Sequence, residues 1–238
     1  MATVLAALPA SRRAGADTCP APPRGDALAH VDARVRIDYL SKSFDREIDD
    51  IDEWSWIWGS VYAAGAVAQG VGRAETTDPG KRIDLTVGTI STAFGAVTLS
   101  GLPLQITLPL RSARRHLYDQ DPCAALARAE RTLVSAERDQ ALGTGILAHL
   151  GNVAVNAGIA LILGLGYGRW PSAALSAGVG ITVGEANAFT QPHHLKDVLE
   201  RYRSGRFDGP DVPPLSVSWA VTPLVTRDTL GLGVALSW

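Results

Sequence analysis

Four long stretches of this chain carry no charged side chain, and small residues recur in them at four-residue intervals. Two of these stretches lie in residues 141–192, on either side of Arg169. Their small or short polar residues are Ala148, Asn152, Asn156, Ala160, Gly164 and Gly168, then Ser172, Ser176, Gly180, Gly184 and Ala188. Side chains four residues apart share one face of a helix, and small residues let helix backbones approach closely in a membrane. The pattern predicts a tight helical membrane hairpin.

A second membrane hairpin is predicted over residues 54–110. Residues 54–72 and 85–110 are free of charge and long enough to cross the hydrocarbon core of about 30 Å. Their small residues again recur every four positions: Ser60, Ala64, Ala68 and Gly72, then Gly88, Thr92, Ala96 and Ser100. Trp54, Trp56 and Trp58 at its start are typical of an interfacial aromatic belt. Pro103 and Pro109 predict that the second helix ends or kinks before Leu110.

Charged segments alternate with these apolar stretches. Residues 28–53 have helical spacing and an acidic end, which predicts an acidic amphipathic helix with Val31, Val35, Tyr39 and Phe44 on its apolar face. Residues 111–140 predict a soluble amphipathic helix. Its apolar face comprises Leu126, Ala129, Leu133 and Ala136. Residues 193–214 predict a short polar helix followed by a loop rich in Gly, Pro and Asp.

The tail, residues 215–238, changes to a period of two. Apolar residues alternate with small ones on both sides of residues 226–229, which predicts a β-hairpin. An alternating segment that ends in an aromatic residue, Trp238, is also typical of outer-membrane barrels. Barrel strands are about ten residues long, however, and the charge-free runs here are longer. We therefore predict a mainly α membrane protein with about four spans in two hairpins and a C-terminal β-hairpin, with an outer-membrane β-barrel as the alternative.

The N-terminal residues 1–27 resemble an export signal followed by an irregular linker. Residues 3–10 are apolar, and Ala14-Gly15-Ala16 fits a cleavage site. No positive charge precedes the apolar run, and Arg12-Arg13 interrupts it, so the match is partial. Cys19 and Cys123 are the only cysteines. Two interpretations of them stay open: one disulfide on an oxidising side of a membrane, or two free thiols.

Glu185 is the leading candidate for a functional polar residue. An ionisable group at membrane depth is costly unless it is paired or hydrated, and Asn152 and Asn156 are placed to hydrogen-bond across the hairpin to Glu185 or Asn187. Polar side chains in membrane bundles also serve as structural glue. His149 and the pair His193-His194 lack metal-site spacing, and the acidic run of residues 45–53 lacks the EF-hand glycine.

No motif for catalysis or for a cofactor stands out. The glycines at 164, 166 and 168 lie in an apolar run rather than in a phosphate-binding loop, and no nucleophile elbow occurs. We expect a non-enzyme without cofactor or metal. A net charge of −2 and the lack of a basic patch argue against a nucleic-acid partner. The expected partners are the lipid bilayer and further copies of the chain.

The segment LGYGRW followed by AGVGITVGEANAFTQP resembles a motif of uncharacterised bacterial predicted membrane proteins. The resemblance covers residues 54–238 and implies a membrane or envelope location but no activity. We expect a structural or assembly protein of the bacterial cell envelope, in the inner membrane rather than the outer one. A channel or transporter that uses Glu185 is the alternative function. If both cysteines lie outside, the short basic connections at residues 73–82 and 169 lie in the cytoplasm, whereas Arg111, Arg114 and Arg115 lie outside, against the positive-inside rule.

Overall fold

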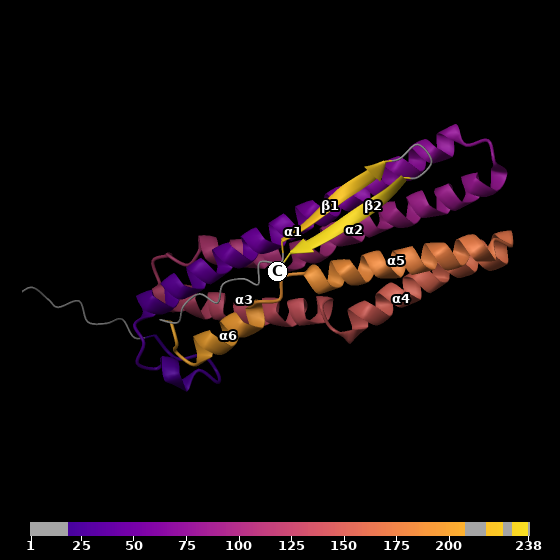
Figure 1. Ribbon diagram of the computed structural model, residues 1–238. Helices are drawn as coiled ribbons and strands as arrows, with labels where there is room; N and C mark the ends of the chain where they lie inside the picture. Colours follow the sequence, from indigo (N-terminus) through magenta and orange to yellow (C-terminus); the bar gives the residue numbers. More distant parts are fainter. Residues whose placement is uncertain (1–18, 208–217, 226–229, 238) are drawn as a thin grey trace, which may run out of the picture.

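The computed structural model describes residues 19–207, 218–225 and 230–237, and these are mainly helical (Figure 1). The segment expected to be an export signal lies outside the described residues. The helical elements are η1 (Asp26–Leu28), α1 (Ala33–Glu75), α2 (Pro79–Arg115), α3 (Pro122–Gly143), α4 (Ile146–Leu161), the π-helical turn η2 (Ile162–Gly166), α5 (Trp170–Thr190) and α6 (Leu195–Arg203). Aspartates cap α1, α2 and α3, since the side chains of Asp32, Asp78 and Asp121 each accept a hydrogen bond from a first-turn N–H.

The helices form a head and two antiparallel hairpins that project from it (Figure 1). The head joins the first half of α1 and the end of α2 to α3 and α6. Its core consists mainly of aliphatic side chains, among them Leu40, Leu110, Leu126, Leu133 and Leu195, together with the aromatic Phe44. The second half of α1 pairs with α2, and α4 pairs with α5. Two of the described helical segments, Pro79–Arg115 and Ile146–Gly166, are long and apolar enough to cross a membrane.

Helix α1 is one continuous helix of 43 residues, whereas the sequence predicted an acidic helix that ends at residue 53 and a separate span. Its inward face follows a seven-residue repeat through both parts: Ile37, Phe44, Ile51, Trp58, Gly65 and Gly72. A heptad repeat keeps one face toward a partner helix. The same helix therefore belongs to the head and to the first hairpin. Val35, predicted on the apolar face, is 46% exposed because it lies off this repeat.

Helix α2 continues through both prolines to Arg115, so of the two predicted outcomes before Leu110, an end or a kink, the end is wrong. A proline inside a helix removes one backbone hydrogen bond and costs about 3 kcal/mol. Ile106 and Leu110 beyond Pro103 are buried in the head core. Their burial favours continuation of the helix, since each buried aliphatic side chain contributes about 1.5–3 kcal/mol. Helix α3 begins at Pro122, and its four predicted apolar residues are all buried, as expected.

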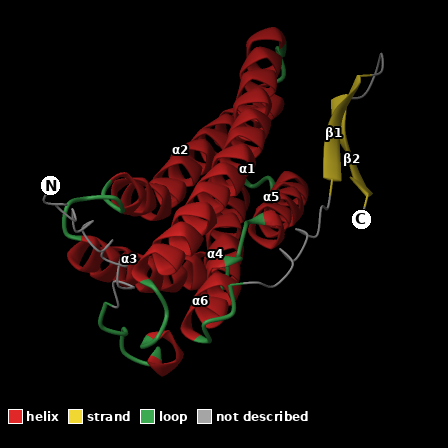
Figure 2. Ribbon diagram, turned by 90° about the vertical axis from the view of Figure 1, so that its left-hand side faces the viewer, coloured by secondary structure: helices red, strands yellow, loops and turns green. Residues whose placement is uncertain are grey.

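The C-terminal strands β1 (Ser218–Val225) and β2 (Leu230–Ser237) pair antiparallel, with Ser218 opposite Ser237 and Val225 opposite Leu230. They lie where the period of two predicted a β-hairpin. Figure 2 shows this ribbon standing apart from the helices. The barrel alternative required strands over the two charge-free regions. It is wrong for the described residues, because residues 54–115 and 146–190 are helical except for two short connections.

One buried carboxyl group in the head predicts a pH-dependent stability. Glu47 is 2% exposed, and burial raises the pKa of its carboxyl group to about 7, with Asp50 adding to the rise and the Gln140 hydrogen bond opposing it. The folded state thus holds the proton more tightly than the unfolded state. The stabilisation, about 3 kcal/mol, is complete below pH 4.5 and is lost as the pH rises through 7.

Thermal unfolding of the purified protein in detergent, followed by circular dichroism from pH 4.5 to 8, measures this effect. We expect the wild-type melting temperature to fall relative to that of Glu47→Gln as the pH rises, because the amide does not titrate. Comparison of the two proteins cancels the other titrating groups. Parallel pH profiles would contradict the prediction.

Candidate functional site

The second hairpin places polar side chains of α4 directly over glycines of α5. A Cβ atom added to Gly180 would overlap the Asn156 side chain, and one added to Gly184 would overlap the Asn152 side chain. At the far end, a Cβ atom on Gly164 would come within 2.7 Å of the Trp170 ring. The predicted four-residue faces of the two halves therefore meet. The connection reverses direction at Gly168, whose φ of 67° suits glycine.

These contacts assemble a polar cluster around Glu185. Asn152 Nδ2 donates to Glu185 Oε1 at 2.8 Å and to the carbonyl of Ile181 at 3.1 Å. Asn156 Nδ2 donates in turn to Asn152 Oδ1 at 2.8 Å. Nδ1 of His149 lies 2.6 Å from the other oxygen, Glu185 Oε2. The cluster is half-buried, since the side chains of His149 and Glu185 are each 25% exposed.

The structure thus joins all three predicted polar residues, Glu185, Asn152 and Asn156, in one chain of hydrogen bonds. Asn187, the alternative partner, has a buried Nδ2 without a hydrogen-bond partner among the described residues. Sequence reasoning considered His149 only as a metal ligand and missed its pairing with Glu185. The spacing of His149 and Asn152, three residues apart on one helix, puts them on the same face and was the available signal.

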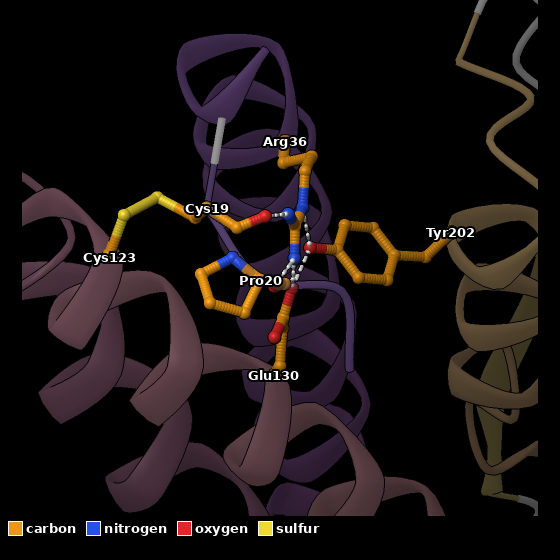
Figure 3. Close-up of polar contacts among 6 residues, drawn as sticks. All are labelled: Cys19, Pro20, Arg36, Cys123, Glu130 and Tyr202. Atoms are coloured by element: carbon orange, nitrogen blue, oxygen red, sulfur yellow. Dashed lines mark hydrogen bonds and ion pairs between the residues drawn. A yellow bond between two sulfur atoms is a disulfide. The ribbon is translucent and has the colours of Figure 1, made fainter. Parts of the chain in front are cut away.

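The head holds a second buried polar cluster, which the sequence did not reveal (Figure 3). Arg36 is fully buried and donates from Nε to the Tyr202 hydroxyl at 3.1 Å and from Nη1 to the Cys19 carbonyl at 3.1 Å. Its Nη2 reaches the Pro20 carbonyl at 3.2 Å and forms an ion pair with Glu130. The Tyr202 hydroxyl also donates to Glu130. The cluster therefore ties α1, α3, α6 and the segment after Cys19 together.

A disulfide joins Cys19 to Cys123 beside this cluster, so the two residues are not free thiols in the structure, and their place on an oxidising side of a membrane stays a prediction. Cys123 lies in the first turn of α3, and the bond fixes the segment whose carbonyls accept from Arg36. Disulfides persist on the oxidising side of membranes. The cluster and the disulfide brace the head and are remote from Glu185 in sequence and in element.

The described residues contain no group of three His, Cys, Asp or Glu side chains that could hold a metal ion. Two carboxylates of the acidic run form ion pairs with arginines of α2 instead, Asp45 with Arg114 and Asp52 with Arg111. The ring of His193 stacks on that of His194 at 5.6 Å. These side chains therefore have partners within the described part of the protein.

In the first hairpin, the face of α1 that meets α2 includes the predicted Gly72 but otherwise differs from the predicted one. The contacts run through Tyr62, Gly65, Gln69 and Gly72, whereas Ser60 and Ala64 are exposed. Residues spaced by four drift about 40° around a helix at each step, because a turn takes 3.6 residues. Packing in the head sets the phase of the heptad repeat of α1. This phase therefore determines which face of α1 contacts α2. On α2, the predicted Gly88 and Thr92 do face α1, against Gln69 and Gly65.

The two hairpins are joined near each end. Close to the head, Thr190 Oγ1 accepts hydrogen bonds from Nε1 of Trp58 at 2.9 Å and of Trp54 at 3.3 Å. At the tips, Arg169 binds the Asp84 carboxylate through Nε at 2.6 Å and Nη2 at 2.5 Å, and Ser172 donates to the same group. Between these joints lies a cavity of about 390 Å³ lined by all four hairpin helices.

Glycine substitutions in α5 test whether close packing positions the Glu185 cluster. Gly184→Ala is expected to displace the Asn152 side chain. The free energy of unfolding should fall by about 1–3 kcal/mol, because Asn152 then loses its hydrogen bonds to Glu185 and Ile181. Gly178→Ala is the matched control, since its Cβ would meet open space. We expect Gly178→Ala to be neutral or stabilising, as alanine favours a helix by about 1 kcal/mol over glycine.

Melting temperatures of the two variants in detergent compare these effects directly. Equal melting temperatures would contradict a packing role for Gly184.

Comparison with known proteins gives no independent information on the geometry of the site. The motif that suggested a resemblance to bacterial membrane proteins includes Gly184, Glu185 and Asn187, and the structure places all three on one turn of α5. Its family assignment stays a prediction. No family model, no curated protein and no solved structure matches this chain.

Proposed function

We propose that this chain is a non-enzymatic integral membrane protein of the cell envelope, whose two hairpins cross the bilayer and anchor a disulfide-braced head on its outer side. Its role would be structural or in assembly. The proposal rests mainly on one observation, the contrast between the well-packed head and the apolar side chains left exposed along the hairpins.

Large apolar side chains are exposed on the outer surfaces of three hairpin helices. They include Ile90, Val97 and Leu104 on α2, Leu150 and Leu161 on α4, Leu165 on η2, and Leu175 and Phe189 on α5, each at least 50% exposed. Soluble monomers rarely expose apolar patches beyond a few hundred Å². Exposure to water costs about 25 cal/mol for each Å² of such surface, whereas lipid tails solvate it without that cost. This distribution supports placement of the hairpins in a bilayer.

The aromatic residues and the helix lengths fit the same placement. Trp56 and Phe189 are exposed at the head end of the hairpins, and Tyr167 and Trp170 are exposed at the tips. Trp and Tyr favour the membrane interfaces. Helix α5 has 21 residues, which span about 31 Å at 1.5 Å per residue. That length matches a hydrocarbon core of about 30 Å.

The charges and the disulfide support one orientation. The tips carry Arg73, Lys81, Arg82 and Arg169, and basic residues in short connections favour the cytoplasm. The disulfide favours the oxidising side for the head. Of the three arginines that opposed this orientation on sequence grounds, Arg111 and Arg114 form ion pairs with Asp52 and Asp45 of α1, whereas Arg115 is exposed and still opposes it.

Fractionation of cells that express the full chain tests the membrane placement. We expect the protein in the membrane pellet after an alkaline carbonate wash and in solution only after detergent is added. Recovery from the soluble fraction without detergent would overturn the proposal.

Cysteine labelling of intact cells or spheroplasts tests the orientation. Thr77 at the tips and Ser204 in the head are both exposed. A membrane-impermeant maleimide is expected to label Ser204→Cys directly but Thr77→Cys only after the membrane is permeabilised. The reverse pattern would show that the head lies in the cytoplasm.

A further inference from the structure

We infer that the cavity between the two hairpins holds water and gives protons access to the Glu185–His149 pair. The inference rests on the proposed membrane placement, and it assigns the hairpins a proton-binding site in addition to anchoring. Three features carry it: the separation of the hairpins at mid-length, the polar groups on the cavity wall, and the link from that wall to Glu185.

The cavity is a half-open cleft between the two hairpins. About 390 Å³ remains between α1, α2, α4 and α5, and part of this space opens to the surface of the bundle. Tyr62 and Phe94 line it together with small residues, Gly65, Gly151 and Gly180. The joints at Thr190 and at Asp84 hold the hairpins together at both ends. The space therefore results from contacts that join the two hairpins at their ends and leave them apart in between.

Both hairpins contribute polar groups to this cavity. Its lining includes Gln69 of α1, Ser91 and Thr92 of α2, and Asn152 and Asn156 of α4. A buried water needs roughly 10–15 Å³ and two to four polar partners, so the cavity has room and partners for several waters. Purely apolar cavities stay dry. The amide and hydroxyl groups on both walls, which lie among apolar side chains such as Val61, Val155 and Ile159, provide the polar partners that such waters need.

Asn152 connects the cavity to the ionisable pair. It lines the cavity and donates to Glu185, whose other carboxylate oxygen lies next to Nδ1 of His149. A proton that reaches the carboxylate from water can pass to Nδ1 of neutral His149. The resulting imidazolium can release a proton from Nε2, which leaves both groups in their starting charge states once the ring returns to its original tautomer. No covalent bond other than O–H and N–H bonds changes.

A proton fits the pair better than a metal cation. Metal sites in proteins use at least three or four ligands, with calcium taking six to eight oxygens. The described residues contain no such group of His, Cys, Asp and Glu side chains. Carboxylate and imidazole side chains at membrane depth are typical of proton relays.

Labelling of single cysteines in proteoliposomes distinguishes water from lipid in the cavity. Ser91→Cys places a thiol on the cavity wall, and Val97→Cys, 70% exposed on the same helix, places one on the outer surface. Ser204→Cys in the head is the positive control. The native cysteines are paired and do not react. A small, charged thiosulfonate is expected to modify Ser91→Cys and Ser204→Cys but not Val97→Cys.

The labelling pattern distinguishes failure of the present inference from failure of the membrane placement. If neither Ser91→Cys nor Val97→Cys reacts, the cavity holds lipid or is closed to water, and the present inference is overturned while the membrane placement stands. If Val97→Cys reacts as fast as Ser204→Cys, the outer surface faces water and the membrane placement itself is wrong.

Proton flux tests the role of Glu185 in the same proteoliposomes. A pH-sensitive dye trapped inside reports acidification after a pH step with valinomycin and potassium present. We expect wild-type flux above that of protein-free liposomes and at least a tenfold loss in Glu185→Gln, which keeps an oxygen for Asn152 but cannot ionise. Glu200→Gln, exposed in the head, is the control and should retain full flux.

Wild-type flux equal to that of empty liposomes, or equal flux in wild type and Glu185→Gln, would overturn the proton role. Circular dichroism melting of each variant identifies one that has failed to fold. In that case Glu185→Asp, which retains the ionisable group, must restore flux if the inference is right.

Discussion

Arg36→Met is expected to lower the free energy of unfolding by about 3–5 kcal/mol, one of the two largest effects of any single change that we predict. The arginine side chain is fully buried and forms an ion pair with Glu130, which is 7% exposed. Its removal leaves the Glu130 carboxylate in the head core with the Tyr202 hydroxyl as its remaining side-chain donor among the described residues. Two backbone carbonyls, of Cys19 and Pro20, lose their donors as well.

Denaturant or thermal unfolding in mild detergent, followed by circular dichroism, measures this loss. Arg34→Met is the matched control, because Arg34 lies two residues away on the same helix and is exposed. The double variant Arg36→Met/Glu130→Leu should recover much of the stability, since it removes both charges from the core. A loss below 1 kcal/mol in Arg36→Met would show that the cluster does not hold the head together.

Replacement of both cysteines by alanine is expected to cost about 4–5 kcal/mol. The disulfide spans 104 residues, and in the chain-entropy model a loop of about 100 residues contributes about 4.7 kcal/mol through the unfolded state. The folded state suffers too, because the disulfide holds the segment whose carbonyls accept from Arg36. We therefore expect the two effects to be coupled rather than additive.

A double-mutant cycle of Cys19→Ala/Cys123→Ala with Arg36→Met measures that coupling through unfolding free energies. A combined loss smaller than the sum by at least 0.5 kcal/mol is expected, since contacting groups show interaction energies of that size or more. Full additivity would mean that the bond and the arginine stabilise the head independently. Loss of the disulfide should leave the Glu185 cluster and its flux unchanged, because that cluster lies on α4 and α5, which carry no residue of the disulfide or of the Arg36 cluster.

The amino-acid sequence by itself determined which segments form helices and, for α3, which face of the helix is buried. Charge-free runs with helical spacing predicted helices in both hairpins, and the apolar face of α3 was predicted residue by residue. The pairing of Asn152 with Glu185 was predicted as one of two options, since Asn152 lies on the small-residue face of α4 and Glu185 follows Gly184 on that of α5. These features depend on residues close in sequence or on one helix–helix contact.

Only the tertiary structure decided which face of α1 points inward, how far α2 runs beyond its prolines, and which residues complete each polar cluster. The head fixes the phase of α1 over 43 residues, and so turns Ser60 and Ala64 outward although their spacing matches that of the other helices. Arg36, Glu130 and Tyr202 are separated by 94 and 72 residues, and nothing local marks them as partners. Contacts between residues so distant in sequence depend on the packing of several helices at once, which no single stretch of sequence specifies.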